Sequence, residues 1–176
     1  MPWKRSRAPA ERSADAAAAR AKALELLAGR DFACEELYGR LCRAFTDEAS
    51  AAVIAELAQA GYLDDARCAA VRARSLLAQH RSRRAIAEAL RRRGIDRDTA
   101  AAALAALYGD GADAPPENGA DPELQAAVSL VERQYRRRLA EGRADLVLAA
   151  LARRGFSGRT ARAALDLVQN GAPPED

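Results

Sequence analysis

The sequence has few of the residues on which enzymes, metal sites and membrane spans depend. It contains one histidine, His80, and three cysteines, an odd number without CxxC spacing, so neither a zinc site nor a disulfide framework is expected. No apolar run approaches the roughly 20 residues needed to cross a bilayer, and the N-terminus lacks the apolar core of a secretory signal. We therefore expect a soluble protein of the reducing cytoplasm, without cofactor or metal.

Aromatic residues and lysines are also scarce. Aromatics make up 5% of the chain although 49% of its residues are apolar, because alanine supplies much of the apolar content. Alanine favours helices and adds little to a core, which predicts an all-α protein built of thin helical modules. Lys4 and Lys22 are the only lysines, so arginine carries the remaining fixed positive charge, and the net charge is +3.

Motifs of catalysis are missing as well. The chain has no glycine-rich phosphate loop, no Ser-His-Asp set with a spare histidine and no cofactor fingerprint. Asp64-Asp65 resembles a metal-binding acidic pair, but helix capping explains the pair, and no second acidic cluster or histidine accompanies it. We therefore predict that the protein is not an enzyme.

What the chain does contain is a recurring signal for the end of one helix and the start of the next. In each signal a glycine that can take positive φ ends a helix, an apolar anchor follows, and an aspartate caps the next helix. The clearest two are Gly61-Tyr62-Leu63-Asp64-Asp65 and Gly94-Ile95-Asp96. They predict helices over 65–79, 83–93 and 97–108.

Apolar residues repeat with the same spacing in separate parts of the chain. Spacings of 4, 5 and 9 occur in Ile86, Leu90, Ile95, Leu104 and again in Val147, Leu151, Phe156, Leu165, while Leu37, Leu41, Phe45, Ile54 follow a degenerate 4, 4, 9. Periods of roughly 45 to 60 residues with three helices each are typical of tandem modules. We expect three three-helix repeats in an elongated molecule, straight or curved.

The module boundaries follow from composition and from the helix signals. We expect a disordered basic tail at 1–13, a degenerate repeat at 14–60, the best-preserved repeat at 61–108, an acidic Gly/Pro linker at 109–121, a third repeat at 122–170 and a C-terminal tail at 171–176.

The second and third copies carry a family resemblance. Gly61-Tyr62-Leu63-Asp64-Asp65-Ala66-Arg67 and Leu90-Arg91-Arg92-Arg93-Gly94-Ile95-Asp96 resemble the middle repeat of the RecX family, the bacterial regulators of the RecA recombinase. Leu151-Ala152-Arg153-Arg154-Gly155-Phe156-Ser157 resembles the last repeat of that family, and the likeness covers about residues 20–168. Cys68 stands where the family usually has an aromatic residue, and 79–82 lacks the glycine often found there.

This resemblance implies a non-enzymatic protein that binds RecA and lies along the groove of RecA filaments on DNA. It would inhibit filament growth, ATP hydrolysis and strand exchange, and so act in recombination, DNA repair and the SOS response. Single- or double-stranded DNA is a second candidate partner, and we expect a monomer.

Arginines in the middle repeat are candidate contacts with such a partner. Arg67, Arg74 and Arg81 are seven residues apart and fall on one line if their helix extends that far. Arg83 and Arg93 flank the apolar seam of the next helix, and the methylene stems of their side chains can lie over that seam. On that next helix the alternative is an exposed ion-pair ladder of Arg84, Glu88 and Arg92.

The third repeat is more strongly basic. Between residues 133 and 162 nine arginines accompany only Glu141 and Asp145, a local charge of +7, which attracts acidic protein faces or phosphates. The candidates here are Arg133, Arg136, Arg137, Arg143, Arg153 and Arg154, beside the structural pair Gly155 and Phe156. Tyr135 either packs between helices or stacks on a base.

Two functions of different classes therefore stay open. The first is regulation of RecA filaments, with a protein as the main partner. The second is direct DNA binding, in which the helix pair around Gly94 acts like a helix-turn-helix.

Overall fold

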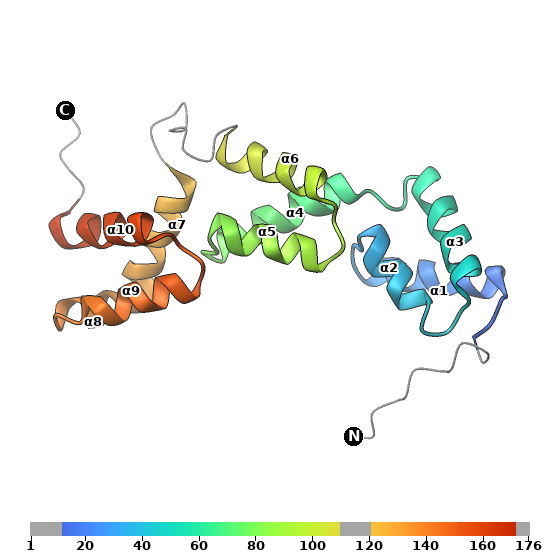
Figure 1. Cartoon of the computed structure of the whole chain (residues 1–176), viewed down its shortest axis with the longest axis horizontal. Helices are drawn as coiled ribbons and strands as arrows, with labels where there is room; N and C mark the ends of the chain where they lie inside the picture. The colour runs from blue at the N-terminus through green and yellow to red at the C-terminus, as the bar shows by residue number, and fades with distance from the viewer. Residues whose placement is uncertain (1–11, 110–120, 172–176) are drawn as a thin grey trace, which may run out of the picture. The chain divides into compact units, whose positions relative to one another are not determined.

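The computed structural model describes residues 12–109 and 121–171, which are mainly helical (Figure 1). The helices are α1 (Ala16–Gly29), α2 (Cys34–Leu41), α3 (Asp47–Gln59), α4 (Asp65–Ala78), α5 (Arg83–Arg92), α6 (Arg97–Tyr108), α7 (Pro122–Leu130), a π-helical segment (Val131–Tyr135), α8 (Arg136–Ala140), α9 (Ala144–Arg153) and α10 (Gly158–Asn170). Within these ranges the only β-type pairing is an isolated bridge between Ser13 and Phe45. The all-α prediction is confirmed.

The helices of the middle repeat begin and end where their caps predict, to within one residue. The Asp64 carboxylate accepts the backbone N–H of Arg67 at 2.8 Å, and Asp96 accepts N–H groups of the first turn of α6. Gly61 and Gly94, which follow α3 and α5, have φ of 76° and 79°. Glycine takes this conformation without the steric cost that a Cβ imposes.

The chain divides into two compact units, and the division passes through α4, α5 and α6. Of the described residues, the first unit holds 12–69 and 91–99, and the second holds 70–90, 100–109 and 121–171. Each unit therefore combines helices of one terminal repeat with parts of the middle repeat.

The core of the first unit buries most of the apolar positions that the spacing selected. Its buried residues are Ala19, Ala23, Phe32, Leu37, Leu41, Phe45, Val53, Leu57 and Leu63. Ile54 is only half-buried, whereas its neighbour Val53 is 2% exposed. The side chain that α3 presents to the core is therefore that of Val53, one position before the residue that the spacing selected.

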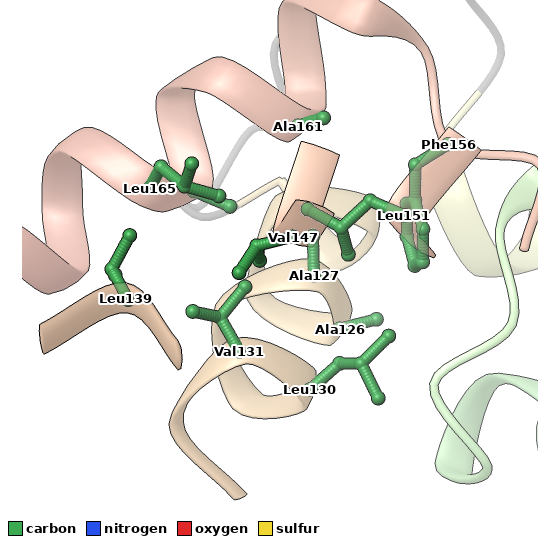
Figure 2. Close-up of a cluster of buried hydrophobic side chains, with 11 residues drawn as sticks. Ala126, Ala127, Leu130, Val131, Leu139, Val147, Leu151, Phe156, Ala161 and Leu165 are labelled. Atoms are coloured by element: carbon green, nitrogen blue, oxygen red, sulfur yellow. The ribbon is translucent and has the colours of Figure 1, made fainter. Parts of the chain in front are cut away.

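The core of the second unit lies between α7, α9 and α10 (Figure 2). Its buried residues are Ala126, Ala127, Leu130, Val131, Leu139, Val147, Leu151, Phe156, Ala161, Ala164 and Leu165. All four positions that the repeat spacing selected in this copy are among them. The corresponding four positions of the middle repeat, Ile86, Leu90, Ile95 and Leu104, are also buried.

The helix that the sequence predicts from residue 122 to about Leu139 is interrupted. Val131–Tyr135 is π-helical and separates α7 from α8. Val131 and Leu139 are both buried, although eight residues on a regular α-helix place two side chains about 80° apart. The wider π turn absorbs one residue, and this brings both side chains to the core.

Two expectations for the middle repeat are wrong. Tyr62 is not a buried anchor, because its side chain is 54% exposed while the adjacent Leu63 is 5% exposed. Arg67, Arg74 and Arg81 do not form one helical line, because α4 ends at Ala78 and Arg81 lies beyond that end. His80, just before Arg81, has a positive φ of 56° that turns the chain out of the helix.

Most of the predicted tail and linker, together with Trp3, lies outside the described residues, which exclude 1–11, 110–120 and 172–176. The end of the predicted N-terminal tail is attached to the first unit. Arg12 Nη1 lies 2.7 Å from Asp47 Oδ1, and Ser13 exchanges backbone hydrogen bonds with Ala44 and Thr46.

Candidate partner-binding surface

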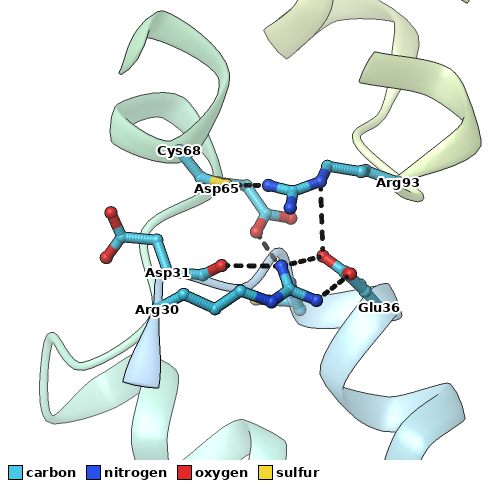
Figure 3. Close-up of polar contacts among 7 residues, drawn as sticks. Arg30, Asp31, Glu36, Asp65, Cys68 and Arg93 are labelled. Atoms are coloured by element: carbon cyan, nitrogen blue, oxygen red, sulfur yellow. Dashed lines mark hydrogen bonds and ion pairs between the residues drawn. The ribbon is translucent and has the colours of Figure 1, made fainter. Parts of the chain in front are cut away.

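Arg93, one of the predicted contact residues, lies in a polar cluster of the first unit (Figure 3). Its Nε is 3.6 Å from Glu36 Oε2, and its Nη1 is 3.9 Å from the sulfur of Cys68. Arg30 Nη2 is 2.6 Å from the other oxygen of Glu36. The Glu36 carboxylate near the start of α2 thus pairs with two guanidinium groups, and Arg93, which directly follows α5, joins the end of that helix to α2.

Asp65 belongs to the same cluster, and Asp64 alone caps α4. Asp65 Oδ1 accepts the backbone N–H of Cys34 at 2.8 Å. Burial raises the pKa of the Cys34 thiol to about 11 and also raises the pKa of Cys68. Both thiols therefore stay protonated near neutral pH, a state in which cysteine is a poor nucleophile.

Glycine allows a close approach at the corner that follows Arg93. A Cβ on Gly94 would collide with the side chain of Glu35 in the first turn of α2. In the second unit a Cβ on Gly155 would lie 2.5 Å from Ser82 Oγ, which donates a hydrogen bond to the carbonyl oxygen of Arg154 at 3.1 Å. The two turns Gly94-Ile95 and Gly155-Phe156 thus pack in the same way, because the glycine of each lies against the start of an earlier helix, α2 or α5.

Arg83 is half-buried in the second unit, where it meets the ends of α6 and α7. Its backbone N–H donates to Glu123 Oε1 at 3.2 Å, and its guanidinium carbon lies 5.4 Å from the centroid of the Tyr108 ring. Burial raises the pKa of both Glu123 and Tyr108. Arg83 flanks the apolar seam as predicted. At this position, however, it makes contacts inside the protein, with Glu123 and Tyr108.

The other predicted arginines are exposed to solvent, apart from the half-buried Arg154. The exposed ones are Arg67, Arg74, Arg81, Arg133, Arg136, Arg137, Arg143 and Arg153. Except for Arg67, all belong to the second unit. Arg137 pairs with Glu141 at 2.9 Å while its side chain is 93% exposed, and such surface pairs exchange partners at little cost.

Tyr135 packs inside the second unit. Its ring is half-buried against the core, and the guanidinium carbon of Arg138 lies 5.7 Å from the ring centroid. The packing interpretation of Tyr135 is thus the one that the contacts favour. Arg154 bonds to the residue before Tyr135: its Nη2 donates to Gln134 Oε1 at 3.1 Å.

Sequence reasoning missed the setting of His80. The imidazole is half-buried, and its pKa is lowered by that burial and by the positive charges of Arg133 and Arg154. Two arginines that are far from His80 in sequence therefore lie near it in the second unit. The sequence feature that could have indicated this setting is His80 itself, which stands in a turn where the positive φ favours glycine.

Comparison with known proteins identifies the family. The model of the RecX second three-helix domain matches residues 64–104. The regulatory protein RecX of Mycobacterium avium is 37% identical over 145 residues, which cover 79% of this chain and 78% of that protein. The chain belongs to the RecX family. The regulatory protein RecX of Mycobacterium leprae is 36% identical over 150 residues, covering 81% and 80% of the two chains.

The fold agrees with this membership. RecX from Lactobacillus salivarius, whose crystal structure is known, superposes with a TM-score of 0.70 at 18% identity, covering 88% of this chain and 97% of that one. RecX proteins are regulatory proteins and not enzymes. In the described part of the chain, no cluster of three potential metal ligands occurs, and no helix combines the length and apolarity of a membrane span.

The position of His80 in this RecX protein predicts its titration. Since burial and two nearby guanidinium groups disfavour the imidazolium, the pKa of His80 should lie below that of the same histidine in the urea-unfolded chain. The ring would then gain its proton only at lower pH than in the unfolded chain. NMR can follow this single imidazole directly, and a pKa at or above the unfolded value would contradict the described geometry.

Proposed function

We propose that this protein binds RecA and RecA–DNA filaments and inhibits filament growth, ATP hydrolysis and strand exchange, and so modulates recombination and DNA repair. Membership of the RecX family is the observation that carries the proposal. The exposed arginines of the second unit support it, because guanidinium groups pair well with the carboxylates of an acidic protein face.

The repeated three-helix construction suits a partner that itself consists of repeated subunits. Each small module offers only a limited contact area, and linked modules that bind together gain affinity through their high effective concentration. A filament presents the same subunit surface many times, so several modest contacts can add to stable binding. The protein would act in this way without changing any covalent bond.

Direct DNA binding is the second candidate function. The local charge of +7 between residues 133 and 162 favours it, because arginines that neutralise phosphates release condensed counterions. Such binding weakens steeply as salt concentration rises. A contact that combines packing with a few ion pairs is less sensitive to salt.

Binding to RecA filaments on single-stranded DNA and to the same DNA alone, measured at increasing salt, separates the two functions. The RecA proposal predicts tighter binding to the filament at every salt concentration and persistence of that binding after naked DNA is released. Equal binding to filament and naked DNA, with the same steep dependence on salt, would instead support the DNA-binding function.

Reversing exposed charges should locate the contact surface. Arg136 and Arg153 are exposed, so replacing both with glutamate should leave the free energy of unfolding within about 0.5 kcal/mol of wild type. It should weaken inhibition of RecA ATP hydrolysis about tenfold or more, because two attractive contacts become repulsive. Arg83 and Arg93 suit this test less well, since both make contacts inside the protein.

The matched control reverses two exposed arginines of the first unit, Arg43 and Arg97. Both double variants change the net charge equally. Equal loss of inhibition in both would point to overall charge as the cause, and would contradict a specific role of Arg136 and Arg153.

A further inference from the structure

A hollow of about 300 Å³ opens in the second unit between the end of α4 and the start of α7. Carbon atoms of Leu77, Pro122 and Ala126 supply apolar lining, and Leu77 also packs against the core of the unit. Arg74 and His80 contribute two nitrogen-bearing side chains from the α4 side. An apolar surface beside basic groups fits a ligand that combines hydrocarbon with negative charge.

His80 gives this hollow a polar group that is ready to bind. Its positive φ of 56° is a backbone conformation that costs a non-glycine residue about 1 kcal/mol or more. The imidazole lines the hollow, and within the described part of the chain its ring nitrogens form no hydrogen bond. The strained turn thus places an imidazole, with a nitrogen available to a partner, at the wall of the hollow.

The surroundings of His80 are electropositive. Arg74 lines the hollow, and Arg133 and Arg154 are close enough to lower the pKa of His80. The remaining polar side chains of the lining, Gln125 and Ser129, are neutral. No acidic side chain is among these lining groups, so the lining itself offers an incoming anion positive charge and neutral hydrogen-bonding groups.

A peptide fits these features better than a nucleic acid does. Proteins that bind single strands stack the bases mainly on large aromatic side chains, and the lining of the hollow contains no Phe, Tyr or Trp, so that the imidazole of His80 is its one aromatic ring. The apolar surface of Leu77 and Ala126 suits an aliphatic side chain. A carboxylate next to it would complement Arg74 through a charge-assisted hydrogen bond.

We propose that this hollow is a docking site for an acidic peptide segment of a partner protein. A glutamate or aspartate carboxylate of that segment meets Arg74 and His80, and an adjacent aliphatic side chain packs on Leu77 and Ala126. The assignment deepens the proposed function and rests on it for the partner being a protein. Binding of an acidic peptide to the hollow can be tested without RecA.

Because His80 is the sole histidine, its imidazole resonances report on the hollow without interference. The probes are a short synthetic peptide that alternates glutamate with leucine, the same peptide with glutamine in place of glutamate, and oligothymidylate. We expect saturable shifts of the His80 resonances with the glutamate peptide and much smaller shifts with the other two. An equal response to the glutamine peptide, or a larger response to oligothymidylate, would overturn the proposal.

Two variants, measured with a fluorescent glutamate peptide, separate binding from folding. His80→Gly removes the imidazole and suits the positive φ, so the protein should be at least as stable while its affinity for the peptide falls about threefold to tenfold, the value of one neutral hydrogen bond. Arg74→Glu should weaken binding about tenfold or more. Arg43→Glu, an equal charge change at an exposed residue of the first unit, should have little effect.

Peptide affinities that are unchanged in His80→Gly and Arg74→Glu would overturn the docking site. The two proposals can fail separately. If the glutamate peptide does not bind but the wild-type protein inhibits RecA, the docking site is wrong and the proposed function stands. If the peptide binds as expected but RecA is unaffected, the hollow binds acidic segments and the proposed function is wrong.

Discussion

Replacing Gly155 with alanine is expected to lower the free energy of unfolding by about 3 kcal/mol, from backbone strain together with overpacking. Gly155 has φ of 91°, which side chains disfavour, and the added Cβ would lie 2.5 Å from Ser82 Oγ and 3.5 Å from Ala85 Cβ. The Ser82 hydroxyl cannot move away without losing its hydrogen bond to Arg154. The substitution should therefore loosen the corner between α9 and α10 from the start of α5.

Gly142 provides the matched control within the same unit. Its φ of 74° is similarly positive, but a Cβ there would meet nothing within 4 Å. Gly142→Ala should therefore cost only the backbone strain, about 1 kcal/mol. Urea denaturation followed by circular dichroism measures both variants. If the two substitutions lower the free energy of unfolding equally, the close contact with Ser82 adds no cost at Gly155, and the packing explanation is wrong.

Truncating Leu151 to alanine should have a similarly large effect, about 3 kcal/mol of lost stability. Leu151 is fully buried and lies in the same core cluster as Leu130, Val147 and Phe156 (Figure 2). The loss combines the transfer free energy of the removed carbons with the cavity that remains. Thermal unfolding should show a clear drop in the melting temperature.

Leu148 tests whether burial causes that effect. It belongs to the same helix, α9, but is only half-buried at the edge of the cluster. The chemical change in Leu148→Ala is the same, so the loss should be about 1 kcal/mol, in proportion to the smaller buried area. A larger loss at Leu148 than at Leu151 would mean that the inward face of α9 is assigned wrongly.

Local chemistry accounts for the features that the sequence predicted well. The side chains of Asp64 and Asp96 cap helices through bonds to residues two or three positions away, and no knowledge of the rest of the fold is needed to expect them. Apolar spacing works for the same reason, because a helix with a buried stripe repeats every three to four residues. Leu90 and Leu151 are therefore both buried.

The features that sequence reasoning missed depend on contacts between distant segments. The π turn arises because Val131 and Leu139 must both reach one core, and the sequence alone does not specify where that core lies. Tyr62 is apolar enough to be buried, but its place after Gly61 leaves the ring in solvent. The pairing of Arg93 with Glu36 joins residues from two different repeats.

The candidate surface shows the same contrast. Helical phase predicted that Arg83 and Arg93 flank the apolar seam, and both are half-buried there. Phase could not show that Glu123 and Glu36 would meet them. The grouping of Arg133 and Arg154 near His80 also requires the fold. The sequence thus predicts which elements carry charge, and the tertiary contacts decide which charges remain available to a partner.

The rate of ATP hydrolysis by RecA on single-stranded DNA, measured while this protein is added, tests regulation of RecA most directly. We expect the rate to fall progressively as the ratio of protein to RecA rises toward one to one, and Arg136→Glu with Arg153→Glu to need a higher ratio for the same effect. An unchanged rate at every ratio up to stoichiometric would contradict the proposed function.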